Sequence, residues 1–328
     1  MARVSNAPAW SILANFLIVV VCSLPGILLE FAVKSPSAPF QRGLFCNDES
    51  LRYPFKQSTI SNSLAVLLCL GVPLIGMLIV EWLLFRRYKA LGELARNVPM
   101  YHGIKILSLK VHSYVVSIFS TYIPFLFAAT VTLSLTNCLK YVIGRLRPHF
   151  LTVCQPNLTA LPCLDADGYQ TYMQDIQCNP RADPYYLLDA RLSFPSGHAS
   201  GAACGFVYFA IYLQLRMVWK GPYLLRPFIQ VLGIAGAVMI AASRVSDYKH
   251  FWSDVLFGFF LGTVIAVLMA LFVSDLYFFD TPSTIEDIPS TKEFNTSPSD
   301  TDLSTIITMP NYQSTGSAVT SVKRPINI

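Results

Sequence analysis

Long apolar stretches separated by short polar segments dominate the pattern of this chain. Six of them have the length, roughly 17 or more mostly apolar residues, that a helix needs to cross a bilayer. A helix is required because every backbone amide must be paired within the segment where water is absent. The predicted spans are 10–33, 63–85, 113–139, 199–215, 225–243 and 252–278. We therefore expect an all-α, polytopic membrane protein with six transmembrane helices.

Composition supports this class. Of the 328 residues, 53% are hydrophobic and only 13% are charged. Soluble domains carry about 25% charged residues, so a soluble globular enzyme is excluded. Apolar residues in this proportion must be buried, which excludes disorder for most of the chain. From about Thr281 the sequence becomes rich in Ser, Thr, Pro and Asp. The predicted organisation is a six-span domain over residues 1–280 and a disordered cytosolic tail over residues 281–328.

Basic residues in the short connections predict the orientation, because Lys and Arg accumulate on the cytoplasmic side. The most basic connection follows the second span, with Arg86, Arg87, Lys89, Arg96, Lys105 and Lys110. With six spans, both termini are then cytosolic, and residues 34–62, 140–198 and 244–251 lie on the outer or lumenal side. The net charge of +5 does not indicate nucleic-acid binding, because no basic stripe interleaved with aromatic residues accompanies it.

The eight cysteines divide along the same lines. Those in or beside spans are expected to be small packing residues: Cys22, Cys69, Cys138 and Cys204. Those in outer segments are expected to form disulfides: Cys46, Cys154, Cys163 and Cys178. The three possible full pairings stay open, although a bridge within 140–198 is expected. The sequon at Asn157 is expected to carry a glycan, and the one at Asn295, in the cytosolic tail, is not.

Three polar clusters stand at the outer ends of predicted spans. In the first, residues 140–148, Lys140, Gly144 and Arg147 share one helix face if the third span continues one or two turns past Cys138. The two cations would then point at one spot. The alternative is that they anchor the helix end at the membrane interface, as most basic residues there do.

The second cluster, residues 194–198, leads directly into the fourth span. Backbone amides at a helix start attract anions, and Ser196 is of a type that caps helices. The expected structure is a phosphate cradle formed by Ser196 and Gly197 beside His198. The alternative is an ordinary capped helix start with an incidental histidine.

The third cluster, residues 243–254, places His250 and Asp254 at i and i+4. A carboxylate within hydrogen-bond reach can fix the imidazole tautomer and raise its basicity. Arg244 adds guanidinium donors suited to phosphate oxygens. The alternative for the pair is a purely structural hydrogen bond, and residues 247–249 are interpreted as surface residues. All three clusters fall on the same predicted side of the membrane. No zinc-type cysteine spacing or carboxylate pair accompanies them, so no metal is expected.

These clusters resemble the motifs of the type 2 phosphatidic acid phosphatase superfamily. Residues 140–148 are similar to K-x6-RP, residues 195–198 to PSGH, and residues 243–254 to SR-x5-H-x3-D. From about residue 8 to residue 280, the chain resembles the lipid phosphate phosphatase branch of that superfamily.

The resemblance implies a role for each motif residue. His250 would attack phosphorus to form a phosphohistidine, Asp254 would orient His250, and His198 would protonate the leaving alkoxide. Residues expected to hold the phosphoryl oxygens are Lys140, Arg147, Ser196, Gly197 and Arg244. Three fixed cations can neutralise the charge that other phosphatases neutralise with a metal, so no cofactor is expected. Arg145 is assigned no chemistry.

The implied substrates are phosphatidate, lysophosphatidate, ceramide 1-phosphate and sphingosine 1-phosphate, met at the outer face of the plasma membrane or the lumenal face of an internal one. Self-association into homo-oligomers is also implied. One alternative is a catalytically weak relative that binds lipid phosphates or organises partners, but such proteins typically lack motif histidines. A transporter is disfavoured because Glu30, Glu81 and Asp275 lie near span ends rather than at mid-depth. A vanadate-dependent haloperoxidase would be soluble.

Overall fold

The computed structural model describes residues 9–29, 38–90, 105–106, 109–110, 113–157, 162–217 and 222–274. The chain divides into two units, residues 1–287 and residues 288–328, and every described residue belongs to the first. The predicted tail over 281–328 lies outside the described residues, as do most of the basic connection after the second predicted span and the ends of the first and last spans.

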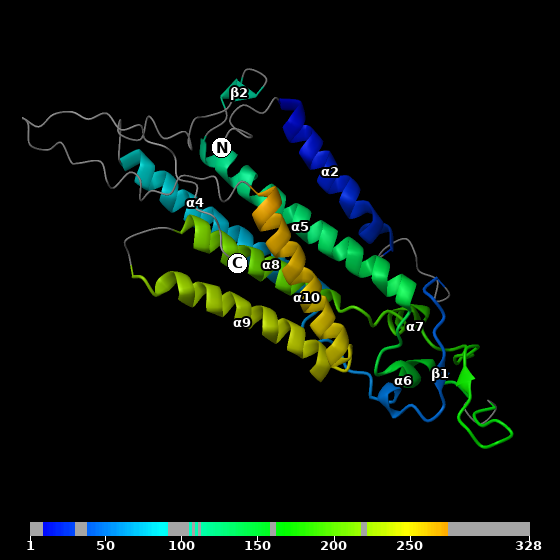
Figure 1. Cartoon of the computed structure of the whole chain (residues 1–328). Coiled ribbons are helices and arrows are strands. Elements are labelled where there is room, and N and C mark those ends of the chain that lie inside the picture. The colour runs from blue at the N-terminus through cyan, green and yellow to red at the C-terminus, as the bar shows by residue number, and fades with distance from the viewer. Residues whose placement is uncertain are drawn as a thin grey trace, which may run out of the picture. The chain divides into compact units, whose positions relative to one another are not determined.

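Long helices dominate the described chain and confirm the all-α prediction (Figure 1). They are α2 (Ala9–Ile27), α4 (Val72–Ala90), α5 (Ser113–Ile143), α8 (Gly197–Arg216), α9 (Leu225–Ser246) and α10 (Trp252–Leu268). The short helix α3 (Asn62–Val66) and the π-helical turn η3 (Leu67–Gly71) precede α4, and the π-helical turn η7 (Met269–Val273) follows α10. Ser61 caps α3, since its hydroxyl accepts a hydrogen bond from the Leu64 amide at 3.2 Å.

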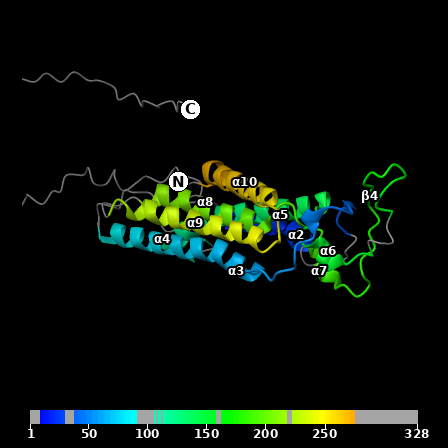
Figure 2. The ribbon, with the colours of Figure 1, turned by 90° about the horizontal axis from the view of Figure 1, so that it is seen from below.

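Smaller elements gather at one end of the long helices in both ribbon views (Figures 1 and 2). They are β1 (Leu44–Phe45), η2 (Glu49–Leu51), α6 (Phe150–Cys154), β4 (Tyr172–Met173) and α7 (Pro184–Asp189). β1 pairs antiparallel with β4, with Leu44 opposite Met173. Elsewhere, β2 (Lys105–Ile106) pairs with β3 (Leu109–Lys110).

Four helical segments among the described residues are long and apolar enough to cross a membrane. They are Asn62–Arg86, Ser117–Ile143, Leu225–Ser246 and Trp252–Val273. The described part of the first predicted span contains a shorter apolar stretch, Leu13–Gly26. The fourth predicted span corresponds to α8, which is long enough but is not among the four. The chain is thus a helical membrane protein, with four clear candidate spans in the part that the structure describes.

The position of α8 explains its lower hydropathy. This helix packs against α4, α5, α9 and α10, so more of its side chains meet protein than those of its neighbours. It is rich in small residues, and it buries polar groups such as Tyr212 and Arg216. A helix surrounded by other helices does not need an apolar surface all round. Figure 2 shows α8 and α9 running side by side.

Two glycines bring α10 close to α8. Gly258 and Gly262 are one turn apart on α10, the spacing of a small-xxx-small contact between membrane helices. A Cβ at Gly258 would lie 2.6 Å from the carbonyl oxygen of Ser196, and one at Gly262 would overlap the carbonyl oxygen of Ser200. We call this close contact between the two helices the α8–α10 seam. It joins the second motif, at the start of α8, to α10, the helix that begins at the end of the third motif.

A buried ionic network joins three helices at the other end of α8. The carboxylate of Glu81, on α4, accepts hydrogen bonds from Arg216 Nε at 2.9 Å and Arg216 Nη2 at 2.7 Å. It also accepts from the hydroxyls of Tyr212 at 2.9 Å and of Ser117, on α5, at 2.5 Å. Because a buried charge is tolerated only when it is paired and hydrogen-bonded, this network specifies how α4, α5 and α8 pack.

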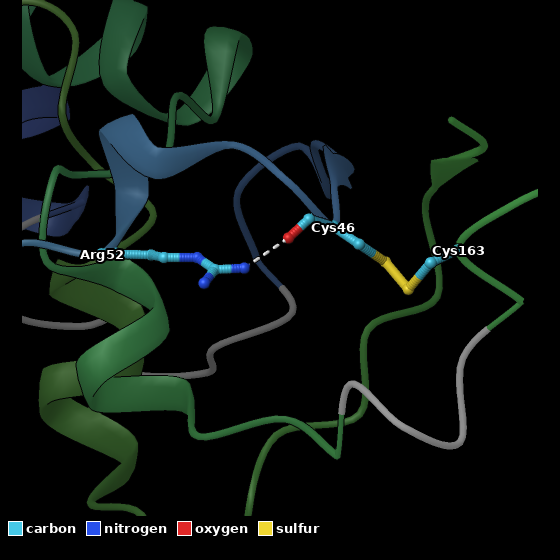
Figure 3. The surroundings of a disulfide bond; sticks show 3 residues. All are labelled: Cys46, Arg52 and Cys163. Atoms are coloured by element: carbon cyan, nitrogen blue, oxygen red, sulfur yellow. Dashed lines mark hydrogen bonds between the residues drawn. A yellow bond between two sulfur atoms is a disulfide. The ribbon is translucent and has the colours of Figure 1, made fainter. Parts of the chain in front are cut away.

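Two disulfides are present among the described residues. Cys154 bonds to Cys178, which confirms the bridge expected within 140–198, and Cys46 bonds to Cys163. Figure 3 shows the second bridge, where Arg52 Nη2 also donates to the Cys46 carbonyl oxygen at 2.7 Å. The four cysteines predicted to be packing residues are unbonded thiols.

We expect Gly262→Ala to destabilise the protein by about 1 to 3 kcal/mol, because the new methyl group overlaps the backbone of α8 and the seam must open. The measurement is the midpoint of thermal unfolding in detergent, which is monitored as the loss of the monodisperse peak on size exclusion. Gly236→Ala, on α9, is the matched control, because no atom lies within 4 Å of the added carbon. Equal midpoints for the two variants would contradict a tight seam.

Candidate active site

The three motifs converge, as the sequence predicts. Arg145 Nη1 donates to Asp254 Oδ1 at 2.5 Å, which joins the first motif to the third. The Ser196 amide donates to the Asp254 carbonyl oxygen at 3.1 Å, which joins the second motif to the third. Just before the second motif, the Ser193 amide donates to the Arg145 carbonyl oxygen at 2.9 Å. The three motifs, although far apart in the sequence, therefore form one layer of polar residues at one end of the long helices.

The first motif does not stay helical, which corrects one expectation. α5 ends at Ile143, and Gly144 takes a left-handed φ of +55°. A side chain at Gly144 would overlap the carbonyl oxygen of Phe40, so a glycine is required on both counts. Arg147 consequently lies beyond the helix and does not share a helix face with Lys140.

Arg147 is buried, and both its backbone amide and its guanidinium group have hydrogen-bond partners. Its amide donates to the Ala190 carbonyl oxygen at 2.8 Å, and its Nη2 pairs with Asp189 Oδ1 at 2.5 Å. Asp189 ends α7. Arg147 Nε is buried and has no hydrogen-bond partner in the part of the chain that the structure describes.

The second motif starts α8 in an unexpected way. Ser196 occupies the N-cap position, but its hydroxyl caps no backbone amide, which corrects the predicted capping role. Instead, Ser196 Oγ is buried without a partner among the described residues. A Cβ at Gly197 would lie 3.6 Å from Lys140 Nζ, so the last turn of α5 faces the first residue of α8. Lys140, of the first motif, therefore lies beside the helix start at which the cradle of Ser196 and Gly197 is predicted.

His198 follows in the first turn of α8, just before the predicted span. Its Nε2 lies 3.0 Å from the carbonyl oxygen of Ile60, in the segment that precedes α3. Burial is the main cause that lowers the pKa of His198 to about 4; the cations Arg244, Lys140 and Arg147 act in the same direction, and the Ile60 carbonyl opposes them. The imidazole is therefore neutral at pH 7 when no anion is bound.

His250, in the third motif, lies between α9 and α10, and its tautomer follows from one contact. Its Nδ1 is 2.6 Å from the carbonyl oxygen of Ser193, which can only accept a hydrogen bond. Nδ1 therefore carries the proton, and Nε2 keeps its lone pair. Burial, with Arg147 and Lys140 nearby, holds the pKa of His250 well below its usual value. The neutral ring is thus a competent nucleophile.

Asp254 does not hydrogen-bond directly to His250 but contacts it through Ser193, which refines the prediction of a direct His250–Asp254 pair. The distance from Asp254 Oδ2 to His250 Nδ1 is 3.9 Å, within ion-pair range but too long for a hydrogen bond. The carboxylate instead accepts from Ser193 Oγ at 2.6 Å and from the Phe251 amide at 3.1 Å. Asp254 therefore fixes Ser193 and the start of α10, while the Ser193 carbonyl holds the imidazole.

Residues 247–249, interpreted above as surface residues, are partly buried in the site. Asp247 is 5% exposed and pairs with Arg244 Nη2 at 3.0 Å. Lys249 is 6% exposed, and its ammonium lies 3.8 Å from the centre of the Phe55 ring. Burial lowers the pKa of Lys249 to about 8. Both side chains contact the segment that precedes α3, which contains no motif: Asp247 binds Thr59, and Lys249 lies over Phe55.

Three further residues of this layer were missed by the motif search. His149 is buried, its Nδ1 lies 2.8 Å from the Tyr248 carbonyl oxygen, and burial lowers its pKa to about 4. Arg191 is buried beside the Phe150 ring. Ser193 holds His250, as described above. Arg191 and Ser193 lie just before the second motif, and His149 follows the first. Their closeness to the motifs in the sequence is the only signal from which they could have been predicted as site residues.

Positive charge exceeds negative charge in this layer. Within the motifs and the adjoining segment 184–194, the cationic side chains are Lys140, Arg145, Arg147, Arg191, Arg244 and Lys249, and the carboxylates are Asp189, Asp247 and Asp254. Each carboxylate pairs with one arginine. The surplus of cations beside three histidines of lowered pKa favours a bound anion.

Comparison with known proteins agrees with this geometry. Residues 121–278 match the family model of the PAP2 superfamily. The chain is 36% identical over 284 residues to a putative phosphatidate phosphatase of Drosophila melanogaster, covering 86% of this chain and 73% of that protein. It is 37% identical over 266 residues to phospholipid phosphatase 2 of Mus musculus, covering 81% of this chain and 87% of that protein.

A third relative, phospholipid phosphatase 1 of Rattus norvegicus, is 37% identical over 267 residues, covering 81% of this chain and 86% of that protein. No solved structure matches the chain. Because the matches extend over most of this chain and of each relative, the chain belongs to the PAP2 superfamily and, within it, to the phospholipid phosphatases.

Proposed function

We propose that this protein is an integral membrane lipid phosphate phosphatase acting through a phosphohistidine intermediate. The proposed substrates are phosphatidate, lysophosphatidate, ceramide 1-phosphate and sphingosine 1-phosphate, which share a phosphate monoester. The names of its relatives and its membrane-spanning helices support a lipid substrate. The presence of both motif histidines within one cationic layer favours an enzyme over a binding protein.

One observation carries the proposal. Three buried donor atoms, Arg147 Nε, Ser196 Oγ and Arg244 Nε, have no hydrogen-bond partner among the described residues. Each belongs to a different motif. Buried polar atoms are almost always hydrogen-bonded, so several unsatisfied donors in one layer need an explanation. A phosphoryl group, whose oxygens accept several charge-assisted hydrogen bonds, supplies one.

The first chemical step follows from the tautomer of His250. Its Nε2 lone pair attacks phosphorus as the bond to the lipid oxygen breaks, and that oxygen keeps the electron pair. Nδ1 stays protonated and hydrogen-bonded to the Ser193 carbonyl, which stabilises the positive charge that develops on the ring. Lys140, Arg147 and Arg244 neutralise the equatorial oxygens of the transition state, where such fixed charges contribute most.

The second histidine, His198, acts first as the general acid and then as the general base. His198 is neutral without an anion, but a phosphate dianion beside it raises its pKa and favours the imidazolium. The imidazolium donates its proton to the departing alkoxide. The neutral ring then accepts a proton from the water that attacks phosphorus, which breaks the bond to His250 and releases inorganic phosphate.

The proposed topology has six spans, with α2 and α8 added to the four clear ones. The active-site layer then faces the outside of the cell or a lumen, together with both disulfides, and the termini are cytosolic. Disulfides persist in oxidising compartments, which supports this orientation. We place the protein at the plasma membrane, with self-association into homo-oligomers.

Intact cells that express the protein are expected to release phosphate from the four lipid phosphates supplied outside, at the same rate with and without excess EDTA. The reason is that fixed cations, rather than a metal, neutralise the phosphoryl charge. The measurement is inorganic phosphate in the medium, compared with cells that express His250→Ala. Activity that EDTA abolishes and Mg²⁺ restores would contradict this mechanism.

The two histidines should fail in different ways. His250→Ala should abolish both the phosphoenzyme and the product with any substrate, since the nucleophile is gone. His198→Ala should lower the lipid rate by roughly 10² to 10⁴, the usual contribution of a general acid. An activated aryl phosphate, whose phenoxide leaves unprotonated, should still label His250. Rapid-quench detection of acid-labile phosphoenzyme measures this, and labelling of the His250 variant would overturn the assignment.

Glycosylation should report the orientation. Asn157 is exposed in the outer segment, so Asn157→Gln is expected to remove the mobility shift produced by endoglycosidase. Asn295→Gln, the matched control in the tail, should leave that shift unchanged. Loss of the shift only in the Asn295 variant would reverse the topology and place the active site in the cytosol.

A further inference from the structure

The first outer segment contacts all three motifs, although it carries none of their residues. We call residues 53–60 the strap. At one end, the Tyr53 amide donates to the Pro148 carbonyl oxygen of the first motif at 3.1 Å. At the other end, the Ile60 carbonyl oxygen lies 3.0 Å from His198 Nε2 and accepts from Arg244 Nη1 at 2.8 Å. One backbone oxygen therefore joins the second and third motifs.

Asp247 holds the strap beside that oxygen. Its Oδ2 accepts from the Thr59 amide at 2.8 Å, and its Oδ1 accepts from Thr59 Oγ1 at 2.7 Å. The same carboxylate pairs with Arg244. Ser61, on the other side of Ile60, caps α3. Residues on both sides of Ile60 are thus fixed, and with them the direction of its carbonyl.

We infer that Asp247 and the strap are positioning elements that set the tautomer of His198, so that Nδ1 is the atom that gives up the catalytic proton. This inference rests on the proposed function and assigns a role to a carboxylate that lies between the residues of the third motif.

The chemistry follows from the acceptor. A carbonyl oxygen offers only lone pairs, so His198 Nε2 must carry a proton to bond to Ile60. Nδ1 is then the nitrogen that gains and loses a proton. In the imidazolium, the Nδ1 proton passes to the lipid oxygen as the phosphorus–oxygen bond breaks and leaves its electron pair on that oxygen. The ring ends neutral, with Nε2–H still donating to Ile60.

Without the strap, the neutral ring can place its proton on either nitrogen, and the imidazolium loses a stabilising acceptor. The charged groups facing His198 are cations: Arg244 from α9, Lys140 from α5, and Arg147 from the segment after α5. The Ile60 carbonyl opposes their effect on the pKa of His198. Its withdrawal therefore lowers that pKa and moves the alkaline limb of a lipid pH–rate profile to lower pH.

The test is Thr59→Val in the full-length protein, which removes one of the two bonds to Asp247 and leaves the Asp247–Arg244 pair intact. We expect kcat on phosphatidate to fall about fivefold, the effect of one hydrogen bond, with an acid shift of the alkaline limb. With an activated aryl phosphate, phosphoenzyme formation should change by less than about twofold, since that leaving group needs no proton. Thr59→Ser should restore the lipid rate, and Gln57→Ala, an exposed neighbour in the strap, is the matched control.

A second variant, Asp247→Asn, removes the charge but keeps the shape. It should give a larger loss on phosphatidate than on the aryl phosphate. An unchanged lipid rate in Thr59→Val, or equal losses on both substrates in both variants, would overturn the inference while leaving the proposed function intact. A wild-type protein that releases phosphate from neither substrate would overturn the proposed function, and this inference with it.

Discussion

Buried positive charge is the constraint on which the rest of the structure depends. Several cationic side chains lie together at one end of an apolar helical bundle, where an unpaired charge is costly. Three carboxylates each neutralise one arginine, and the cationic side chains still outnumber the carboxylates. The strap contributes to their positions, since it accepts a hydrogen bond from Arg244 and donates to its partner Asp247. A site organised in this way needs little rearrangement when charge develops on a phosphoryl group.

Both histidines of the site are oriented by main-chain carbonyls rather than by carboxylates. Ser193 provides the acceptor for His250 and Ile60 the acceptor for His198. A carbonyl oxygen does not titrate in the physiological range, so each tautomer is kept while the charge state of the ring changes. The two rings are nevertheless bound through opposite nitrogens, Nδ1 in one case and Nε2 in the other. In the proposed mechanism, this difference leaves Nε2 of His250 for attack on phosphorus and Nδ1 of His198 for proton transfer.

Much of the fold and of the site could be predicted from the sequence, because motif residues and apolar runs are local signals. The division of the cysteines and the meeting of the three motifs are examples. The predictions that failed depended on contacts between distant segments. Arg147 leaves the helix because Gly144 turns against Phe40, and Asp247 is buried because Thr59 covers it. The span predicted at α8 is not contradicted and stays a prediction; α8 lies below the hydropathy of the four candidate spans and is packed against other helices.

The α8–α10 seam also limits how a lipid can reach the site. At Gly258 and Gly262 the two backbones approach so closely that a single added methyl group overlaps a carbonyl oxygen. A methylene chain is as wide as that methyl group, so no acyl tail fits between these helices. The hydrocarbon part of any bound lipid must therefore lie along another face of α8, with only its polar head reaching the layer where the motifs meet.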